Sequence, residues 1–317
     1  MNLRIGSRGS QLALWQANHI AALLRAKHHT VDIRVIKTTG DRLQEVTFAQ
    51  VGSKGMFTKE IEEALDAGTI DLAVHSLKDL PTELPEPFAL AATPARVDPR
   101  DVLVSTTYTS LFALPEGAKV GTSSQRRRAQ LKALRPDIEA VEFRGNVDTR
   151  LRKLGEGQVD AILLAAAGLD RLEKTEWIRE RLDPADFCPA AGQGALGIET
   201  RKDDKKTIAA LAFLDDPDTR FAVTAERAAL AALGGGCQVP IGVHCRIVPG
   251  SKDGVLDGRW DEVFAVVAAP ETGESVRILH RAPRRGNDPV IFGQVAAQKL
   301  MDAGAGPLLE AAGGVVN

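Results

Sequence analysis

Short apolar runs alternate with helical patterns from the start of this chain, and this order constrains the possible folds more than any other feature. Strand-like runs at residues 3–6, 31–36 and 70–76 are separated by helical patterns at residues 10–27 and 57–67. A strand, a helix and a second strand in this order form a unit in which the two strands are parallel. The N-terminal part is therefore predicted to be an α/β domain.

The same order begins again after residues 93–100, a stretch with two prolines that we interpret as a crossing into a second domain. The expected strands are residues 101–104, 118–124, 138–143 and 159–165, and the expected helices are residues 124–134 and 147–155. This repetition predicts two α/β domains with a cleft between them.

The C-terminal part has a different pattern, which begins after a glycine-rich turn expected at residues 190–197. Helices are expected at residues 205–214, 217–233 and 289–303, and alternating strands at residues 241–248, 262–268 and 275–281. Three glycines at residues 234–236 end the second of these helices. A smaller α+β domain is predicted here.

Composition narrows the function classes. The 317 residues carry a net charge of −2 and three cysteines, with no CxxC pair and no histidine at metal-ligand spacing beside them. We expect no metal site, a reducing cytoplasm and no structural disulfide. Neither a signal peptide nor an apolar run that could cross a bilayer is recognisable, so we expect no membrane contact.

Basic residues are concentrated at residues 119–153, where ten Lys and Arg stand against four Asp and Glu. Only 4% of the residues are aromatic, which argues against a platform that stacks nucleic-acid bases. Small anions are the better match for this segment. A solvated helix face and a nucleic-acid patch remain as alternatives, above all for Arg128.

Three junctions between a strand and a helix combine arginine with hydroxyl or turn residues. Arg8 and Ser10 occupy the first, residues 121–128 the second, and Arg144 and Arg150 the third. Exposed amides at a helix N-terminus and guanidinium groups bind carboxylates and phosphates. Two such junctions within one domain indicate a ligand with several acidic groups.

The segment HSLKDLP, residues 75–81, follows a predicted buried strand, at the edge where open α/β sheets bind their ligands. Lys78 and Asp79 could supply an ammonium and a fixed carboxylate there. The alternative is a solvated Lys–Asp pair in a loop. His75 is expected to be a structural histidine.

Two further segments have a functional and an ordinary interpretation. Residues 39–55 could be a lid over a site or a plain surface loop. Cys237 stands in GGGCQVP, residues 234–240, where a flexible loop would expose it for covalent chemistry, although most free cysteines are small buried hydrophobes. Cys188 and Cys245 are expected to be structural. No Walker, Rossmann, HExxH or EF-hand signature is present.

These segments, taken together, resemble the porphobilinogen deaminase (hydroxymethylbilane synthase) family from about residue 4 to residue 245. The motifs that carry the resemblance, in family order, are SRGSQLALWQ (7–16), TTGD (38–41), GSKGMFTKE (52–60), AVHSLKDLP (73–81), GTSSQRRR (121–128), FRGNVDTRL (143–151), AAGLDRL (166–172), PAAGQGALGIE (189–199) and GGGCQVP (234–240). The resemblance implies two α/β domains like those of periplasmic binding proteins, at residues 1–94 with 195–214 and at 95–194, and a third domain at 215–317 that carries the cysteine.

The resemblance also implies an activity. Four porphobilinogen units are joined head to tail with loss of ammonia onto a dipyrromethane primer, which a thioether attaches to Cys237, and water then releases hydroxymethylbilane. Asp79 matches the catalytic carboxylate. The implied cofactor-binding residues are Asp41, Lys54, Ser76, Lys78, Thr122, Ser123, Ser124, Arg126, Arg127 and Arg150, and the implied substrate-binding residues are Arg8, Ser10, Phe57, Arg144, Arg150 and Arg171.

Two other function classes stay open beside this one. A non-enzymatic protein that binds anions between two such domains would need neither Cys237 nor Asp79. Nucleic-acid binding through residues 126–128 is weakened by the negative net charge and by the scarcity of aromatic residues. The resemblance and the lack of an obvious self-pairing helix favour a monomer.

Overall fold

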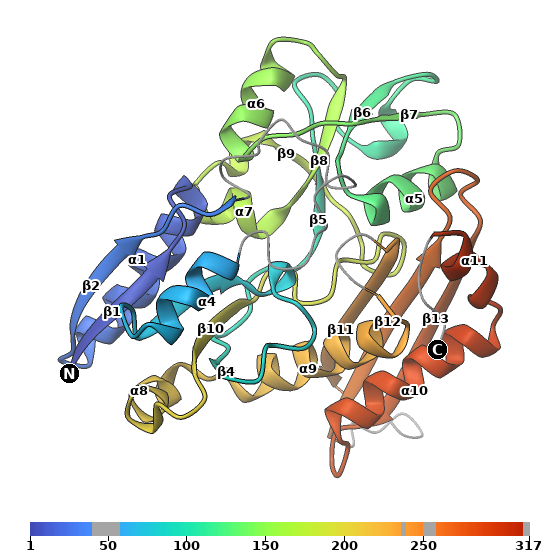
Figure 1. The fold of residues 1–317 in the computed structure, drawn as a ribbon. Helices are drawn as coiled ribbons and strands as arrows, with labels where there is room; N and C mark the ends of the chain where they lie inside the picture. The colour runs from blue at the N-terminus through green and yellow to red at the C-terminus, as the bar shows by residue number, and fades with distance from the viewer. Residues whose placement is uncertain (40–57, 236–238, 250–257, 313–317) are drawn as a thin grey trace. The chain divides into compact units, whose positions relative to one another are not determined.

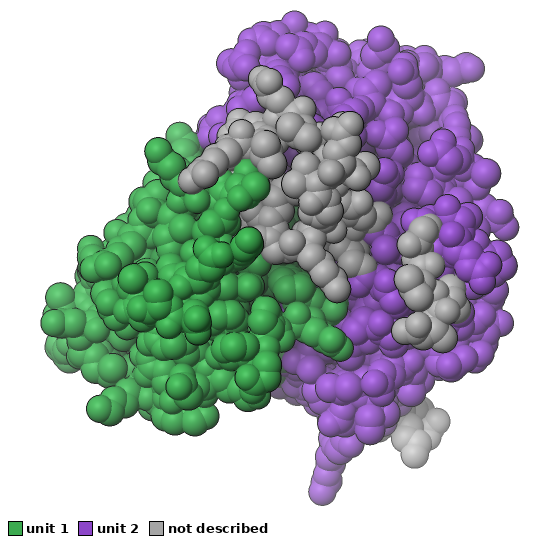
Figure 2. Space-filling model, viewed as in Figure 1, with its two compact units in different colours: residues 1–97, 170–173, 194–220 green, residues 98–169, 174–193, 221–317 purple. Residues whose placement is uncertain are grey.

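The computed structural model describes residues 1–39, 58–235, 239–249 and 258–312. These residues divide into two compact units, which Figure 2 shows in different colours. Unit 1 comprises residues 1–97, 170–173 and 194–220, and unit 2 comprises residues 98–169, 174–193 and 221–317.

A five-stranded mixed sheet forms the centre of unit 1, with the strand order β2-β1-β3-β10-β4 (Figure 1). Strand β1 is parallel to β2 and β3, whereas β10 is antiparallel to β3 and β4. The strands are β1 (Asn2–Ser7), β2 (Thr30–Val35), β3 (Leu72–Ser76), β4 (Phe88–Ala92) and β10 (Leu196–Arg201), and the helices are α1 (Gln11–Ala26), α4 (Lys59–Asp66) and α8 (Lys205–Leu211).

The two faces of this sheet are both covered, because alternate residues of its central strands are apolar on each side. Leu3, Ile5 and Val74 pack against α1 in one buried cluster. Ala73 packs in a second cluster with Ile61 and two other apolar residues of α4 and the segment that follows it. Residues that alternate along β3 therefore face different helices, and His75 lies on the same side as Ala73.

Unit 2 contains a five-stranded sheet of the same topology, with the order β7-β6-β8-β5-β9. Strand β6 is parallel to β7 and β8, and β5 is antiparallel to β8 and β9. The elements are β5 (Asp101–Val104), β6 (Lys119–Gly121), α5 (Gln125–Leu134), β7 (Glu139–Val141), α6 (Val147–Gly155), β8 (Ala161–Ala165) and β9 (Ile178–Arg181). Helix α7 (Ala166–Arg171) begins in unit 2, and its last two residues belong to unit 1.

The C-terminal part of unit 2 is an antiparallel three-stranded sheet in the order β11-β12-β13. One face packs against helices α9 and α10, where a Cβ on Gly293 would lie 2.1 Å from the Ala225 carbonyl oxygen, so the two helices approach closely. The elements are α9 (Pro217–Ala232), β11 (Ile241–Pro249), β12 (Arg259–Ala268), β13 (Ser275–Pro283), α10 (Pro289–Asp302) and α11 (Gly306–Ala311).

The α/β class and the C-terminal sheet with its helices are confirmed. The expected turn at residues 190–197 is wrong at its end, because β10 begins at Leu196 and continues to Arg201. Strands β4 and β9 were not predicted, since both are short edge strands of their sheets. The three-domain boundaries and the cleft stay predictions.

Candidate functional site

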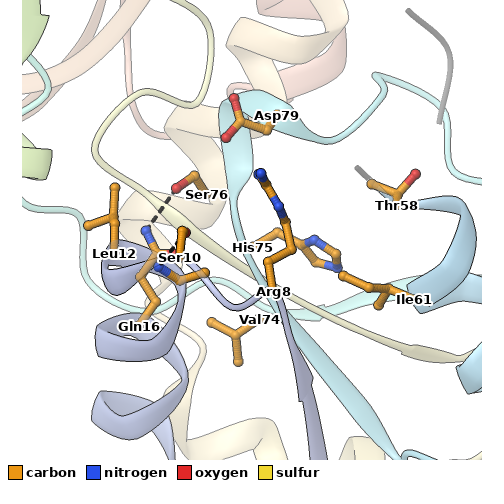
Figure 3. A pocket seen from close by; sticks show the side chains of 11 residues that line it. Arg8, Ser10, Leu12, Gln16, Thr58, Ile61, Val74, His75, Ser76 and Asp79 are labelled. Atoms are coloured by element: carbon orange, nitrogen blue, oxygen red, sulfur yellow. Dashed lines mark hydrogen bonds between the residues drawn. The ribbon is translucent and has the colours of Figure 1, made fainter. Parts of the chain in front are cut away.

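A pocket of about 80 Å³ in unit 1 collects residues from the predicted junction at Arg8 and Ser10 and from the segment HSLKDLP, residues 75–81. Figure 3 shows Arg8 extending from the end of β1 toward the turn that carries Asp79. The lining residues are Arg8, Ser10, Leu12, Ala13, Gln16, Thr58, Ile61, Val74, His75, Ser76 and Asp79. Because β1 and β3 are parallel neighbours, their carboxyl ends bring these residues to one edge of the sheet.

The first junction is fixed by a helix cap. Ser10 has an extended backbone before α1, and its hydroxyl accepts a hydrogen bond from the Ala13 backbone N–H at 3.3 Å. One turn further along, the buried Gln16 side chain donates to the Ser76 hydroxyl at 2.8 Å. Helix α1 is thereby joined to the end of β3, next to the catalytic candidate.

Asp79 ends a 3-10 turn, Leu77–Asp79, that directly follows β3. Leu77 is 1% exposed and anchors this turn in the core, whereas Asp79 is exposed and Lys78 is half-buried. The backbone N–H of Leu77 also donates to the Ala195 carbonyl oxygen at 3.0 Å. The buried Leu77 therefore fixes the turn, and the turn holds the Asp79 carboxylate at the pocket.

Beneath the pocket, His75 and Glu199 form a buried pair. His75 Nε2 lies 2.9 Å from Glu199 Oε2, and Glu199 has no exposed surface. Glu62 of α4 is also close, since burial raises the pKa of Glu62 and the carboxylate of Glu199 adds to the increase. The sequence suggested a structural role for His75, but it did not indicate that this side chain lines the pocket.

A second polar centre lies in unit 2, around the N-terminus of α5. The Ser124 hydroxyl accepts from the Arg127 backbone N–H at 3.4 Å, and the Thr122 hydroxyl accepts from the Ser124 backbone N–H at 3.2 Å. Arg150 of α6 reaches this point and donates to the Ser123 hydroxyl at 3.2 Å. Hydroxyls from one junction and an arginine from the next are thus brought together.

Arg150 forms no ion pair with a carboxylate of the described residues, and its buried Nε has no hydrogen-bond partner among them. Burial, followed by the positive charge of Arg127, lowers the pKa of Arg150 to about 10. A cation in this situation has donor capacity for an anion from outside the chain.

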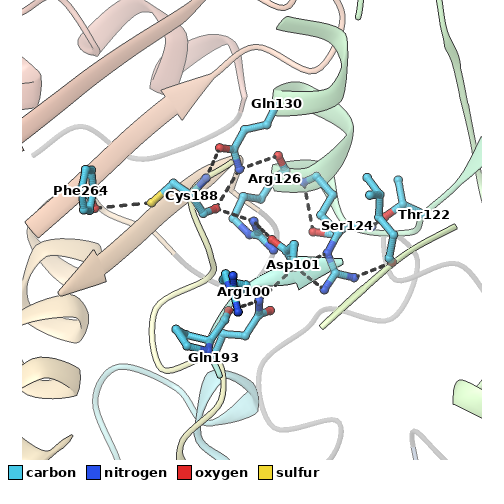
Figure 4. A network of polar contacts seen from close by, with 12 residues as sticks. Arg100, Asp101, Thr122, Ser124, Arg126, Gln130, Cys188, Gln193 and Phe264 are labelled. Atoms are coloured by element: carbon cyan, nitrogen blue, oxygen red, sulfur yellow. Dashed lines mark hydrogen bonds and ion pairs between the residues drawn. The ribbon is translucent and has the colours of Figure 1, made fainter. Parts of the chain in front are cut away.

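Arg126 and Arg127 have a different environment, because both donate to the buried carboxylate of Asp101. Figure 4 shows Arg126 directed at this carboxylate. Arg126 also donates to the Cys188 carbonyl oxygen at 2.6 Å, and Arg127 donates to the Leu163 carbonyl oxygen at 3.0 Å. They are 5% and 6% exposed. Residues so buried do not form a surface for nucleic-acid phosphates.

The remaining arginines of this cluster share another acid. Glu142 lies 3.4 Å from Arg128 and 2.7 Å from Arg144. Asp101 pairs with Arg126 and Arg127, and Glu142 pairs with Arg128 and Arg144, so each of these carboxylates is shared by two arginines. The centre is suited to a ligand with several carboxylates.

Comparisons with known proteins identify the family of this chain. The family model described as "Porphobilinogen deaminase, dipyromethane cofactor binding domain" matches residues 3–209, and the one described as "Porphobilinogen deaminase, C-terminal domain" matches residues 220–302. The chain belongs to the porphobilinogen deaminase family.

Curated relatives agree over nearly the whole length. The porphobilinogen deaminase of Syntrophobacter fumaroxidans is 49% identical over 97% of both chains, and that of Trichlorobacter lovleyi is 48% identical over 97% of this chain and 96% of its own. The solved structure of the methionine-binding protein MetQ aligns with a TM-score of 0.43 at 12% identity, over 71% of this chain and 94% of its own.

Membership in the porphobilinogen deaminase family makes the chain a transferase of tetrapyrrole biosynthesis, with dipyrromethane as its cofactor. A non-enzymatic anion-binding protein is not favoured. No helix in the described part of the chain is long and apolar enough to cross a membrane. Within the same residues, no group of three His, Cys, Asp or Glu side chains could hold a metal ion.

Arg171, an expected substrate-binding residue of the porphobilinogen deaminase motifs, is buried in unit 1. It donates to the Gly194 carbonyl oxygen at 2.8 Å, and its guanidinium carbon lies 6.0 Å from the ring centre of Trp15. Burial lowers the pKa of Arg171 to about 10. Arg171 does not line the pocket around Asp79.

Four expected site residues lie outside the described residues, and their roles stay predictions. These are Asp41, Lys54, Phe57 and Cys237. In the described part, sequence reasoning missed Gln16, Asp101 and Glu199 as parts of the polar centres. Gln16 and Glu199 lie inside the family motifs SRGSQLALWQ and PAAGQGALGIE, and this position was the signal in the sequence that could have indicated a role at the site.

Proposed function

We propose that this chain joins four porphobilinogen units head to tail, with loss of ammonia, onto a dipyrromethane primer attached to Cys237. It then releases hydroxymethylbilane by hydrolysis. The observation that carries this proposal is the convergence of Arg8, Ser76 and Asp79 on one pocket, at the carboxyl ends of two parallel strands. Family membership supplies the reaction class.

The residues of unit 2 fit a cofactor that bears several carboxylates. The fit rests on the unpartnered Nε of Arg150 and on the sharing of one buried carboxylate, Asp101, by two arginines. We propose that Asp41, Lys54, Ser76, Lys78, Thr122, Ser123, Ser124, Arg126, Arg127 and Arg150 hold the cofactor. When bound, dipyrromethane supplies a primer whose terminal pyrrole carbon can be extended.

Arg126 and Arg127 have a specific part in this proposal. Their contacts support a role in shaping the site, because their guanidinium groups are held by the Asp101 carboxylate and by the carbonyl oxygens of Cys188 and Leu163. Arg150 retains an unused donor, Nε, and is the strongest candidate for direct contact with a cofactor carboxylate.

Asp79 is the proposed catalytic residue. Its carboxylate can accept hydrogen bonds from pyrrole N–H groups, stabilise positive charge that develops on the reacting ring, and move protons as acid and base. Arg8 and Ser10 at the same pocket can bind the acidic side chains of a substrate ring. The complete set of proposed substrate-binding residues is Arg8, Ser10, Phe57, Arg144, Arg150 and Arg171.

Intact-protein mass spectrometry tests the proposal. Wild-type protein should carry a mass excess that equals two pyrrole units, and the excess should disappear in Cys237→Ser. Cys245→Ala is the matched control, since Cys245 is a buried thiol that should leave the excess in place. Folded wild-type protein that lacks the excess and releases no ammonia from porphobilinogen would overturn the proposal. We further propose that the protein is cytoplasmic and monomeric. Analytical sedimentation tests the oligomeric state, and cell fractionation tests the location.

A further inference from the structure

Glu199 is a buried carboxylate whose hydrogen-bonding capacity is largely unused. It lies on β10, opposite Ala73 of β3, and has no exposed surface. Oε2 is 2.9 Å from His75 Nε2, whereas Oε1 has no hydrogen-bond partner among the described residues. Burying a carboxylate with so few partners costs free energy, so packing alone gives no reason for an acid at this position.

A second buried glutamate of the chain provides a comparison. Glu226 of α9 also has no exposed surface and also lies near a histidine, with His244 Nδ1 at 3.4 Å. Each of its oxygens, however, accepts a backbone hydrogen bond of 2.7 Å, from Cys245 and from Gly192. Glu226 therefore ties backbone segments together, whereas the described hydrogen bond of Glu199 goes to a side chain.

That side chain reaches the functional pocket. His75 lines it together with Arg8 and Asp79, and the residue is 8% exposed. With Nε2 directed at Glu199, the other ring nitrogen, Nδ1, makes no hydrogen bond within the described residues. A carboxylate that holds one imidazole nitrogen fixes the ring orientation and thereby determines where the other nitrogen points.

We propose that Glu199 is a positioning residue, which acts on the reaction by holding His75 so that Nδ1 is presented to the ring bound at Asp79. The proposal rests on the function proposed above. Glu62 of α4, Glu199 of β10 and Arg8 are the charged groups that surround His75 from the neighbouring elements. An imidazole held in this way can hydrogen-bond a pyrrole substituent without rearranging as the reaction proceeds.

A double-mutant cycle on ammonia release from porphobilinogen tests this coupling. Glu199→Gln and His75→Asn should each lower kcat about tenfold, as expected for one lost hydrogen bond to the reacting ring, with KM changed less than about twofold. If Glu199 acts through His75, the double variant should be no slower than His75→Asn alone. Losses that multiply to about a hundredfold, or a wild-type kcat in Glu199→Gln, would overturn the proposal.

Glu226→Gln is the control for general damage to a buried Glu–His pair. It should lower the thermal unfolding midpoint, since an amide cannot accept both backbone hydrogen bonds, but it should not lower kcat of the folded enzyme. If Glu199→Gln gives too little folded protein, Glu199→Asp withdraws the carboxylate from Nε2 and should show the same loss of kcat.

The wild-type enzyme separates the two proposals. Ammonia release by wild type together with an unaffected Glu199→Gln would leave the proposed function standing and reject the role of Glu199. A folded wild-type protein without ammonia release would reject the proposed function itself.

Discussion

Asp101 Oδ2 lies 2.6 Å from a guanidinium nitrogen of Arg126, and both side chains are buried, with Asp101 fully enclosed. The other oxygen of Asp101 is 2.7 Å from Arg127. One carboxylate at the start of β5 thus fixes two consecutive arginines of α5. The Gln193 side chain adds a third hydrogen bond at 3.0 Å, which connects the segment before β10 to the same acid.

Asp101→Asn should destabilise the folded protein strongly, because two buried guanidinium groups would lose their only charged partner in the described structure. Breaking a buried ion pair costs about 3–5 kcal/mol. Urea denaturation measures the change in the free energy of unfolding. Asp137→Asn is the control, since Asp137 pairs with Arg135 nearer the surface and its loss should change the free energy of unfolding only slightly. Equal losses in the two variants would contradict the prediction.

The same carboxylate predicts how stability depends on pH. Burial alone would raise the pKa of Asp101, but the charges of Arg126 and Arg127 outweigh burial and hold the pKa well below its ordinary value. The stabilisation is therefore complete above about pH 4, where the unfolded carboxyl is ionised, and is lost as the pH falls toward the lowered folded pKa. When the free energy of unfolding is measured at decreasing pH, the values for wild type and Asp101→Asn should converge only at the acid end of the series. A constant difference down to the lowest pH would disagree.

Arg150→Gln should separate stability from cofactor binding. The lowered pKa of Arg150 means that its charged form is disfavoured in the folded state, so removing the charge should not lower the thermal unfolding midpoint. The cofactor mass excess should be lost, because a carboxylate would lose its donor. Arg152→Gln, on the solvent side of the same helix and paired with Glu156, should keep the excess. An Arg150→Gln protein with full excess and full activity would remove Arg150 from the site.

Asp79→Asn should leave substrate binding nearly intact and slow turnover by roughly 10²–10⁴-fold, the usual size of a lost acid–base group. The asparagine keeps the shape of the side chain but neither holds a negative charge nor exchanges a proton. Single-turnover ammonia release measures the effect. Glu83→Gln, at an exposed position shortly after Asp79, should behave as wild type. Near-normal turnover in Asp79→Asn would exclude it from the mechanism.

Thiol labelling should show two reactive cysteines, not three, once the protein is unfolded. Cys188 and Cys245 are buried, and burial raises the pKa of Cys188 to about 12, so neither should react in the folded protein. Cys237 should stay blocked by its thioether. Three labels on unfolded wild type would contradict cofactor attachment at Cys237.

Much of the local structure could be predicted from the sequence, because periodicity and capping residues act over a few positions. The helix that begins after Ser124 and the strand that ends at Ser76 are examples. Strand β10 could not be recognised, since its residues follow a glycine-rich segment and become a strand only by pairing with β3 and β4. Pairing partners that are far apart in the chain leave no local pattern.

The sequence by itself determined the α/β repetition, the catalytic candidate Asp79 and the family. Only the tertiary structure decided which arginines have partners within the chain. Arg126, Arg127 and Arg150 look alike along the chain, but Asp101 binds the first two, whereas the Nε of Arg150 has no hydrogen-bond partner among the described residues. The physical reason is that the electrostatic energy of a charged side chain depends mainly on its nearest counter-charge. The fold brings these partners together from segments that are far apart in the sequence.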